Sequence, residues 1–177
     1  NWWQTETGGI MIANRAGILA ALERAVARVG RSDAALLVAF LDLDGFKAVN
    51  DTRGHRRGDE VLCQVAARLA THARAGDVAG RLGGDEFVLV AEHIPNQEIA
   101  LELGRRIAVA VREPIVLGGD RITVGVSIGL ALASTAGETA AQLLHRADRA
   151  VYAAKRTDSG IAVSAGPLHA LGVRAAT

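Results

Sequence analysis

Acidic side chains stand at two places where apolar runs of the chain end. Asp42 closes the apolar run 35–42, and Asp85 and Glu86 lie between the apolar runs 78–82 and 87–91. If these runs are neighbouring strands, carboxylates at the end of one strand and on an adjacent hairpin converge at one edge of the sheet. Carboxylate oxygens are ligands that hard divalent cations prefer. The sequence therefore predicts a metal site at this edge.

Two glycines, Gly83 and Gly84, come directly before the acidic pair. Glycine adopts positive φ at little cost, so the pattern predicts a tight turn between two strands. The missing side chains would also let the backbone approach a bound molecule closely. A plain hairpin and a binding loop are both compatible with these residues.

The cations of the chain are almost all arginine. Among 20 Lys and Arg residues, only Lys47 and Lys155 are lysines. Arginine bias can follow from codon usage, and a solvated surface lysine is the ordinary case. A lysine is also a compact charge suited to phosphate oxygens.

Composition limits the class of protein. The 177 residues are 50% hydrophobic and 22% charged, as in one globular domain with a sizeable core. A formal net charge of +1 argues against binding a nucleic acid polymer. The uncharged apolar run 122–134 is shorter than the roughly 20 residues that span a bilayer, so we expect no membrane contact by this domain.

The lone Cys63 excludes an intramolecular disulfide and is typical of a reducing compartment. We therefore expect a cytoplasmic domain, alone or as the cytoplasmic part of a larger, membrane-anchored signalling protein.

Hydrophobic periodicity predicts alternating helices and strands. The predicted helices are 14–30, 59–74, 95–111 and 138–156. The predicted strands are 35–42, 78–82, 87–91, 114–117, 121–133 and 161–164. This order indicates an α/β (α+β) sandwich: a mixed central sheet of about five strands flanked by helices, with the acidic pair on a β-hairpin turn. We expect the domain at 14–164, an atypical segment at 1–13, and a tail or linker at 165–177.

The segment 81–87, Arg-Leu-Gly-Gly-Asp-Glu-Phe, resembles the signature of the GGDEF family of diguanylate cyclases. Further blocks at 41–51 with 54–62, at 126–129 and at 147–155 resemble the remaining family motifs in the same order. The resemblance covers 14–160 and implies a nucleotide-cyclase-like fold. It also implies condensation of two GTP molecules into cyclic di-GMP with release of two pyrophosphates.

By resemblance, the carboxylates of Asp42 and Asp85 and the carbonyl of Leu43 would hold Mg²⁺, with Mn²⁺ as a substitute. Glu86 would be a ligand or an electrostatic support, and Asp85 would assist deprotonation of the attacking hydroxyl. Taken singly, Asp42 could instead be a helix cap and the pair Asp85 and Glu86 an ordinary surface turn.

The resemblance also assigns residues to GTP. Asn50 and Asp59 would contact guanine, and Phe46 would pack under the nucleotide. Asp59 as a helix N-cap and Phe46 as a core residue are the structural alternatives. By the same resemblance, Lys47 and Lys155 would bind the phosphates, and Gly83 and Gly84 would let the backbone approach the nucleotide.

Arg74 and Asp77 form an Arg-x-x-Asp motif shortly before the glycine pair. Its place resembles the family's inhibitory site, so the resemblance implies inhibition by cyclic di-GMP. It also implies a transient homodimer, because each protomer would bring one GTP.

Two departures from the family pattern leave other functions open. Serine stands at 159, where the family has a phosphate-binding arginine. Of the family motif that leads into the first helix, only the final Asn14-Arg15 is present. The alternative is therefore a weak or inactive module that binds GTP or cyclic di-GMP as a regulatory domain. A purely structural dimerisation domain is a third hypothesis, and it leaves the acidic turn unexplained.

Overall fold

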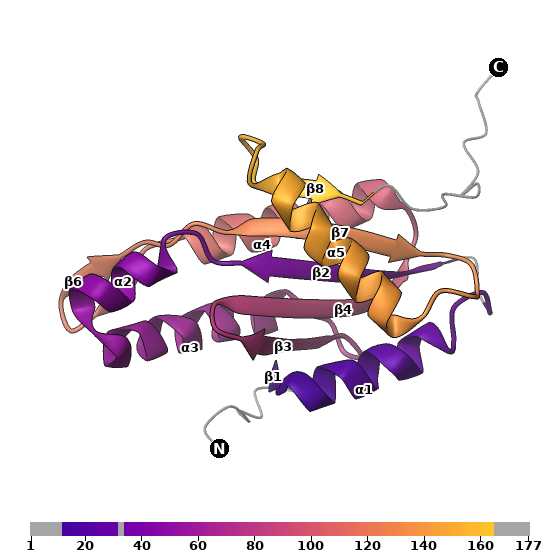
Figure 1. The fold of residues 1–177 in the computed structure, drawn as a ribbon, viewed down its shortest axis with the longest axis horizontal. Helices are drawn as coiled ribbons and strands as arrows, with labels where there is room; N and C mark the ends of the chain where they lie inside the picture. The colour runs from indigo at the N-terminus through magenta and orange to yellow at the C-terminus, as the bar shows by residue number, and fades with distance from the viewer. Residues whose placement is uncertain (1–11, 32–33, 165–177) are drawn as a thin grey trace.

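The computed structural model describes residues 12–31 and 34–164. Within them the chain forms a mixed six-stranded sheet of order β1-β3-β4-β2-β7-β8 and a separate two-stranded hairpin, β5-β6 (Figure 1). In sheet order the strands are β1 Ile12–Ala13, β3 Val78–Gly83, β4 Glu86–Ile94, β2 Ala35–Asp42, β7 Ser127–Ala133 and β8 Ile161–Val163. The two edge pairings are parallel and the inner ones antiparallel. The predicted mixed sheet is confirmed, with the two-residue β1 as an additional edge strand.

Helices cover both faces of this sheet (Figure 1). On one face lie α1 (Arg15–Val26) and α5 (Ala140–Ala154), and on the other α3 (His55–His72) and α4 (Gln97–Arg112). A short helix, α2 (Phe46–Arg53), follows the end of β2. The domain therefore has three layers with two hydrophobic cores.

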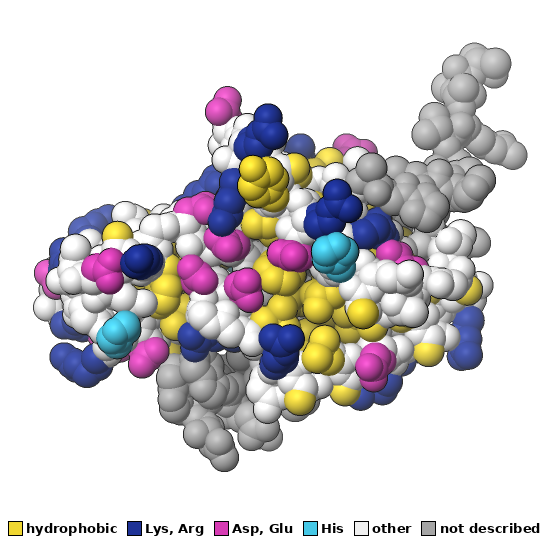
Figure 2. Space-filling model, viewed as in Figure 1, with side chains coloured by type: hydrophobic (Ala, Val, Ile, Leu, Met, Phe, Trp, Pro, Cys, Tyr) yellow, Lys and Arg dark blue, Asp and Glu magenta, His cyan; other side chains and the backbone are white. Residues whose placement is uncertain are grey.

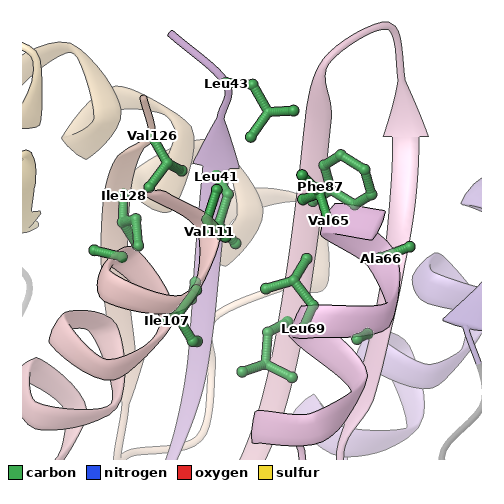
Figure 3. Packing of buried hydrophobic residues seen from close by; sticks show 14 of the residues in the cluster. Leu41, Leu43, Val65, Ala66, Leu69, Phe87, Ile107, Val111, Val126 and Ile128 are labelled. Carbon is green, nitrogen blue, oxygen red and sulfur yellow. The ribbon is translucent and has the colours of Figure 1, made fainter. Parts of the chain in front are cut away.

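The central strand β2 divides its side chains between the two cores. Leu37, Ala39 and Leu41 pack towards α3 and α4, whereas Val38 and Phe40 pack towards α1 and α5. Successive side chains of a strand point to opposite faces, so a strand covered on both sides must be apolar throughout. Figure 3 shows Leu41 among residues of α3 and α4.

The structure corrects the predicted elements in two places. Residues 45–58 were expected to be a polar connection, but they contain α2 and the first turn of α3, which begins at His55 and not at residue 59. The expected strand 121–133 is two strands in different sheets, β6 (Asp120–Ile122), which pairs with β5 (Ile115–Leu117), and β7.

The expected terminal segments 1–13 and 165–177 fall largely outside the described residues, and only Ile12 and Ala13 are placed, in β1. In the part of the chain that the structure describes, no helix has both the length and the apolar character to cross a bilayer.

Candidate active site

The carboxylates singled out in the sequence meet at one end of the sheet. Asp42, the last residue of β2, pairs with Glu86 on β4 and with Ser127 on β7. The backbone N–H of Leu43 donates a hydrogen bond to the carbonyl of Asp85, at 3.2 Å. The exit of β2 and the β3–β4 turn are thus joined directly.

The β3–β4 turn consists of Gly84 and Asp85, between the paired residues Gly83 and Glu86. Gly84 has φ of 55°, in the left-handed region, so glycine is needed there for conformation. Gly83 lies in β3 without a positive φ, and nothing lies within 4 Å of the position its Cβ would take. The requirement for positive φ thus holds for Gly84 and not for Gly83.

Helix α5 brings Lys155 to this end of the sheet. A Cβ on Gly129 of β7 would lie 2.0 Å from the carbonyl oxygen of Ala147 and 2.6 Å from the backbone nitrogen of Val151. The helix can approach the strand so closely only because residue 129 has no side chain. At the C-cap of α5, Lys155 Nζ lies 2.8 Å from Asp42 Oδ1.

Negative charge accumulates around this pair. The hydrogen bond to Asp42 raises the pKa of Lys155 above its ordinary value, and the charges of Asp44 and Asp85 act in the same direction. Burial is the main cause that raises the pKa of Glu86. The negative charges of Asp148, Asp42 and Asp85 raise it further. Figure 2 shows acidic side chains gathered on the face between α2 and α5.

The candidate metal ligands at this edge are oxygen donors, the ligand type that Mg²⁺ prefers. Within the described residues, no three His, Cys, Asp or Glu side chains form a cluster able to hold a metal. The candidate ligands Asp42, Asp85 and the Leu43 carbonyl comprise only two carboxylates. Mg²⁺ is usually bound by one or two carboxylates together with substrate phosphates, so this small set of oxygen donors fits.

Two residues at this end, Ser127 and Asp44, lie in blocks that resemble family motifs, but the sequence alone assigns them no role. The hydroxyl of Ser127, 2% exposed, donates to both carboxylate oxygens of Asp44 at 3.0 and 3.1 Å. The backbones of Asp44 and Gly125 exchange two further hydrogen bonds of 3.0 Å. Asp44 therefore fixes the chain just after Asp42 to the start of β7. The available signal was its position two residues beyond the strand-ending carboxylate.

The sequence alone also assigns no role to Asp148, although its charge helps to raise the pKa of Glu86. It stands seven residues before Lys155, a spacing that places two side chains on the same face of a helix. This periodicity was the signal that could have found it.

The expected guanine-binding residues lie on the two helices that follow β2. Asn50 is half-buried on α2, and Asp59 is exposed on α3. Because α3 begins at His55 with Gly54 as its N-cap, Asp59 is not a helix cap. Phe46 is 7% exposed and belongs to the core between the sheet and α3, while its neighbour Lys47 is exposed.

The Arg-x-x-Asp motif forms a turn at the opposite end of β3. The backbone N–H of Arg74 donates to Asp77 Oδ2 at 2.8 Å, and the N–H of Asp77 donates to the Arg74 carbonyl at 3.0 Å. Burial raises the pKa of Asp77. The length of β3, roughly 20 Å for six residues, separates this turn from the acidic one.

Ser159, at the place of the family's arginine, is engaged in its own loop. Its hydroxyl accepts a hydrogen bond from the N–H of Ile161 at 3.3 Å, and its carbonyl accepts one from Arg112 Nη2 at 3.0 Å. The Ser159 side chain therefore caps the turn before β8, and it offers no positive charge to a phosphate.

Comparison with known proteins agrees with this geometry. Residues 11–160 match the family model described as Diguanylate cyclase, GGDEF domain. The chain is 41% identical over 134 residues to the bifunctional diguanylate cyclase/cyclic di-GMP phosphodiesterase MucR of Pseudomonas aeruginosa, which covers 76% of this chain and 19% of MucR. It is 37% identical over 150 residues to the diguanylate cyclase TpbB of the same species, covering 84% of this chain and 34% of TpbB. The chain thus spans about a fifth to a third of the length of these relatives.

Solved structures share the fold over nearly their whole length. The GGDEF domain of TpbB superposes with a TM-score of 0.81 at 35% identity, covering 88% of this chain and 98% of that one. The GGDEF domain of DgcB from Caulobacter crescentus, solved in complex with c-di-GMP, gives a TM-score of 0.79 at 28% identity, covering 92% and 96%. Because the family model spans most of the sequence, the chain belongs to the GGDEF family of diguanylate cyclase domains.

Proposed function

We propose that this domain condenses two GTP molecules into cyclic di-GMP and releases two pyrophosphates. In each half reaction, a 3′-hydroxyl attacks an α-phosphorus, the new P–O bond forms, and the bond to the β-phosphate breaks. Family membership and the named diguanylate cyclase relatives support this reaction class.

The observation that carries the proposal is the junction between β2 and the acidic turn. The hydrogen bond from Leu43 N–H to the Asp85 carbonyl holds two of the proposed metal-binding residues side by side, with Asp42 one residue before Leu43. Magnesium bound to these residues and to the triphosphate would neutralise phosphate charge and make the attacking hydroxyl more acidic. Asp85 would accept the proton of that hydroxyl, and Glu86 would add negative charge beside the ion.

Lys155 is proposed to turn from Asp42 to the triphosphate when substrate binds. Its Nζ contacts a single carboxylate oxygen and its side chain is 43% exposed, so the amine can change partners without disturbing the core. Lys47, exposed at the start of α2, would also contact the phosphates. Gly83 and Gly84 leave room for the phosphates to approach the turn.

Guanine would bind between α2 and α3. Asn50 can donate to the guanine O6 or N3, and the Asp59 carboxylate can accept from N1–H and N2–H. Phe46, which is buried, would support the nucleotide from below as part of the helix packing.

We further propose that cyclic di-GMP inhibits the domain by binding at Arg74 and Asp77. The exposed Arg74 guanidinium can grip phosphate oxygens in a bidentate manner. The turn between the two residues fixes the carboxylate of Asp77 beside the backbone of Arg74. The complex of DgcB with c-di-GMP supports the chemistry of such a ligand for this fold.

A catalytically weak regulatory module is the second candidate. It is favoured by one observation, the uncharged Ser159, whose hydroxyl is used within its own loop. Such a module would bind GTP without releasing pyrophosphate.

The test is incubation of the folded domain with GTP and Mg²⁺ at high protein concentration, because catalysis needs two GTP-loaded protomers to face each other. The proposal expects cyclic di-GMP and pyrophosphate in a ratio of one to two. Binding of GTP without either product supports the regulatory module instead, and absence of GTP binding contradicts both.

A further inference from the structure

The first turn of α3 passes directly against the side chain of Asn50. A Cβ on Gly58, the fourth residue of α3, would lie 1.9 Å from Asn50 Oδ1 and 3.0 Å from Asn50 Cγ. Bonded neighbours aside, heavy atoms do not approach so closely. The amide of Asn50 therefore occupies the space that any side chain at residue 58 would fill.

Conformation does not explain the glycine at this position. Gly45 and Gly54, which flank α2, have φ of 79°, and nothing lies within 4 Å of where their Cβ atoms would be. Gly58 is instead helical, where glycine costs about 1 kcal/mol relative to alanine. What residue 58 requires is the absence of a side chain on the side of α2, where the Asn50 amide lies.

This close approach involves both regions proposed to bind guanine. Asp59 directly follows Gly58, and Asn50 lies across the gap on the neighbouring helix. The ring of Phe46 closes the same space from below, with its Cζ 3.2 Å from the Cβ position of residue 58. The Asn50 amide thus lies against the backbone of Gly58, with the Phe46 ring beside the same position.

We propose that Gly58 is a positioning residue for base recognition: its missing side chain keeps the Asn50 amide in the orientation that binds guanine beside Asp59. The inference rests on the proposed function, because it assumes that Asn50 and Asp59 contact the base. It adds to that function a specificity determinant that does not itself touch the nucleotide.

The fold should tolerate a methyl group at residue 58. The atom it would meet, Asn50 Oδ1, is the end of a half-buried side chain that can rotate away. Phe46 would have to shift by only a few tenths of an ångström. Alanine also favours the helix more than glycine does. Gly58→Ala is therefore expected to displace the amide and to leave the helix intact.

The experiment measures binding of 3′-deoxy-GTP with Mg²⁺ by calorimetry, because this analogue lacks the attacking hydroxyl and is not turned over. Gly58→Ala should raise the Kd about tenfold, which corresponds to the loss of about 1.4 kcal/mol. Asn50→Ala should have a similar effect, and the double variant should bind no more weakly than Asn50→Ala alone, because two changes that act through one interaction are not additive.

Two controls separate recognition from general damage. Gly104→Ala, in α4, adds a methyl group 3.3 Å from a Leu130 methyl in the core and should leave the Kd unchanged. Binding of 3′-deoxy-ATP should be equally weak in the wild-type protein and in Gly58→Ala, whereas a structural defect would weaken both nucleotides.

Each remaining outcome overturns a stated claim. Failure of the wild-type protein to bind 3′-deoxy-GTP contradicts the proposed function and the inference with it. Normal binding by Gly58→Ala, or losses that add in the double variant, overturns the inference alone. If Gly58→Ala lowers the thermal midpoint, the inference requires Asn50→Ala to restore it in the double variant, and absence of that recovery contradicts it.

Discussion

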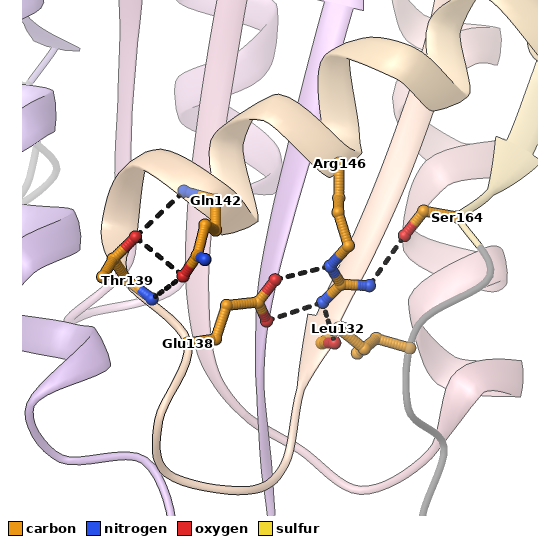
Figure 4. Close-up of polar contacts among 6 residues, drawn as sticks. All are labelled: Leu132, Glu138, Thr139, Gln142, Arg146 and Ser164. Atoms are coloured by element: carbon orange, nitrogen blue, oxygen red, sulfur yellow. Dashed lines mark hydrogen bonds and ion pairs between the residues drawn. The ribbon is translucent and has the colours of Figure 1, made fainter.

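Helix α5 takes part in two ion pairs, one that holds its start and one at its end, and the two differ in how completely they are bonded. In the first, Arg146 in the middle of the helix binds both carboxylate oxygens of Glu138, which lies just before the helix, and donates further hydrogen bonds to Ser164 Oγ and the Leu132 carbonyl (Figure 4). At its end, Lys155 contacts a single oxygen of Asp42.

Exposure follows the same division. The side chains of Arg146 and Glu138 are 19% and 20% exposed, whereas Lys155 is 43% exposed. Through its hydrogen bonds, the half-buried Arg146 guanidinium holds the helix to β7 and to the segment after β8. An exposed amine among several carboxylates is instead free to exchange its partner for another anion. We call the side of α5 held by Arg146 the structural end, and the Lys155 end, proposed to serve the substrate, the functional end.

The largest loss of activity should come from Asp85→Ala, on the β3–β4 turn beside the functional end of α5. We expect cyclic di-GMP formation to fall at least about 100-fold, because one charged group at the reacting centre is lost. The thermal midpoint should stay within about 2 °C, since the hydrogen bond from Leu43 uses the Asp85 backbone. Turnover assays and thermal melts check this, with exposed Asp158→Ala as the control. A melt lowered in step with activity would indicate a structural role for Asp85.

The structural end should respond to Arg146→Met with the opposite pattern. Removal of the guanidinium leaves Glu138 and the Leu132 carbonyl without their partner, at a cost of about 2 kcal/mol of unfolding free energy. The thermal midpoint should fall by roughly 4–8 °C, with turnover per folded molecule unchanged. Arg149→Met, exposed on the same helix, is the control. An unchanged midpoint would remove the distinction between the two ends.

Lys155→Met tests whether the end of α5 serves the substrate. The KM for GTP should rise about tenfold, as for the loss of one charged hydrogen bond. Stability should change little, since exposed ion pairs contribute about 0–1 kcal/mol. Steady-state kinetics and thermal melts measure both, again beside Arg149→Met. A stability loss as large as that of Arg146→Met would show that Lys155 is a structural residue too.

Arg74→Ala changes a residue in the turn before β3, away from both ends of α5, and should affect only inhibition. The cyclic di-GMP concentration that halves turnover should rise about fivefold, the equivalent of about 1 kcal/mol. Initial turnover and the thermal midpoint should not change. Inhibition curves, with exposed Arg105→Ala as the control, measure the effect. An inhibition curve identical to that of the wild-type protein would remove the proposed inhibitory site.

The sequence predicts the central layer of the fold well, because the apolar run and the glycine pair there are each compatible with one local structure. The continuous apolar run that ends on Asp42 gives β2 with the bounds 35–42, and the glycine pair gives the β3–β4 turn. Burial on both faces and a tight turn are both encoded locally. These two features are also the ones that bring Asp42 and Asp85 together.

Other elements depend on tertiary contacts and were missed. Helix α2 is mostly polar, and it is held by the burial of Phe46 and Val49 against the core. The apolar run 121–133 predicts one strand, but Val124 and Val126 are buried without belonging to either sheet. The hydrogen bond between Ser127 and Asp44 joins residues 83 positions apart, and no local pattern announces it.

The central claim is that the end of β2 and the β3–β4 turn form one half of a diguanylate cyclase site. Its most direct test is cyclic di-GMP formation from GTP and Mg²⁺ at increasing concentrations of the wild-type protein and of Asp85→Ala. The wild-type rate per protein molecule should rise with concentration, because two GTP-loaded protomers must meet, and the variant should form almost no product. A folded wild-type protein that binds 3′-deoxy-GTP but forms no cyclic di-GMP at any concentration would contradict the claim.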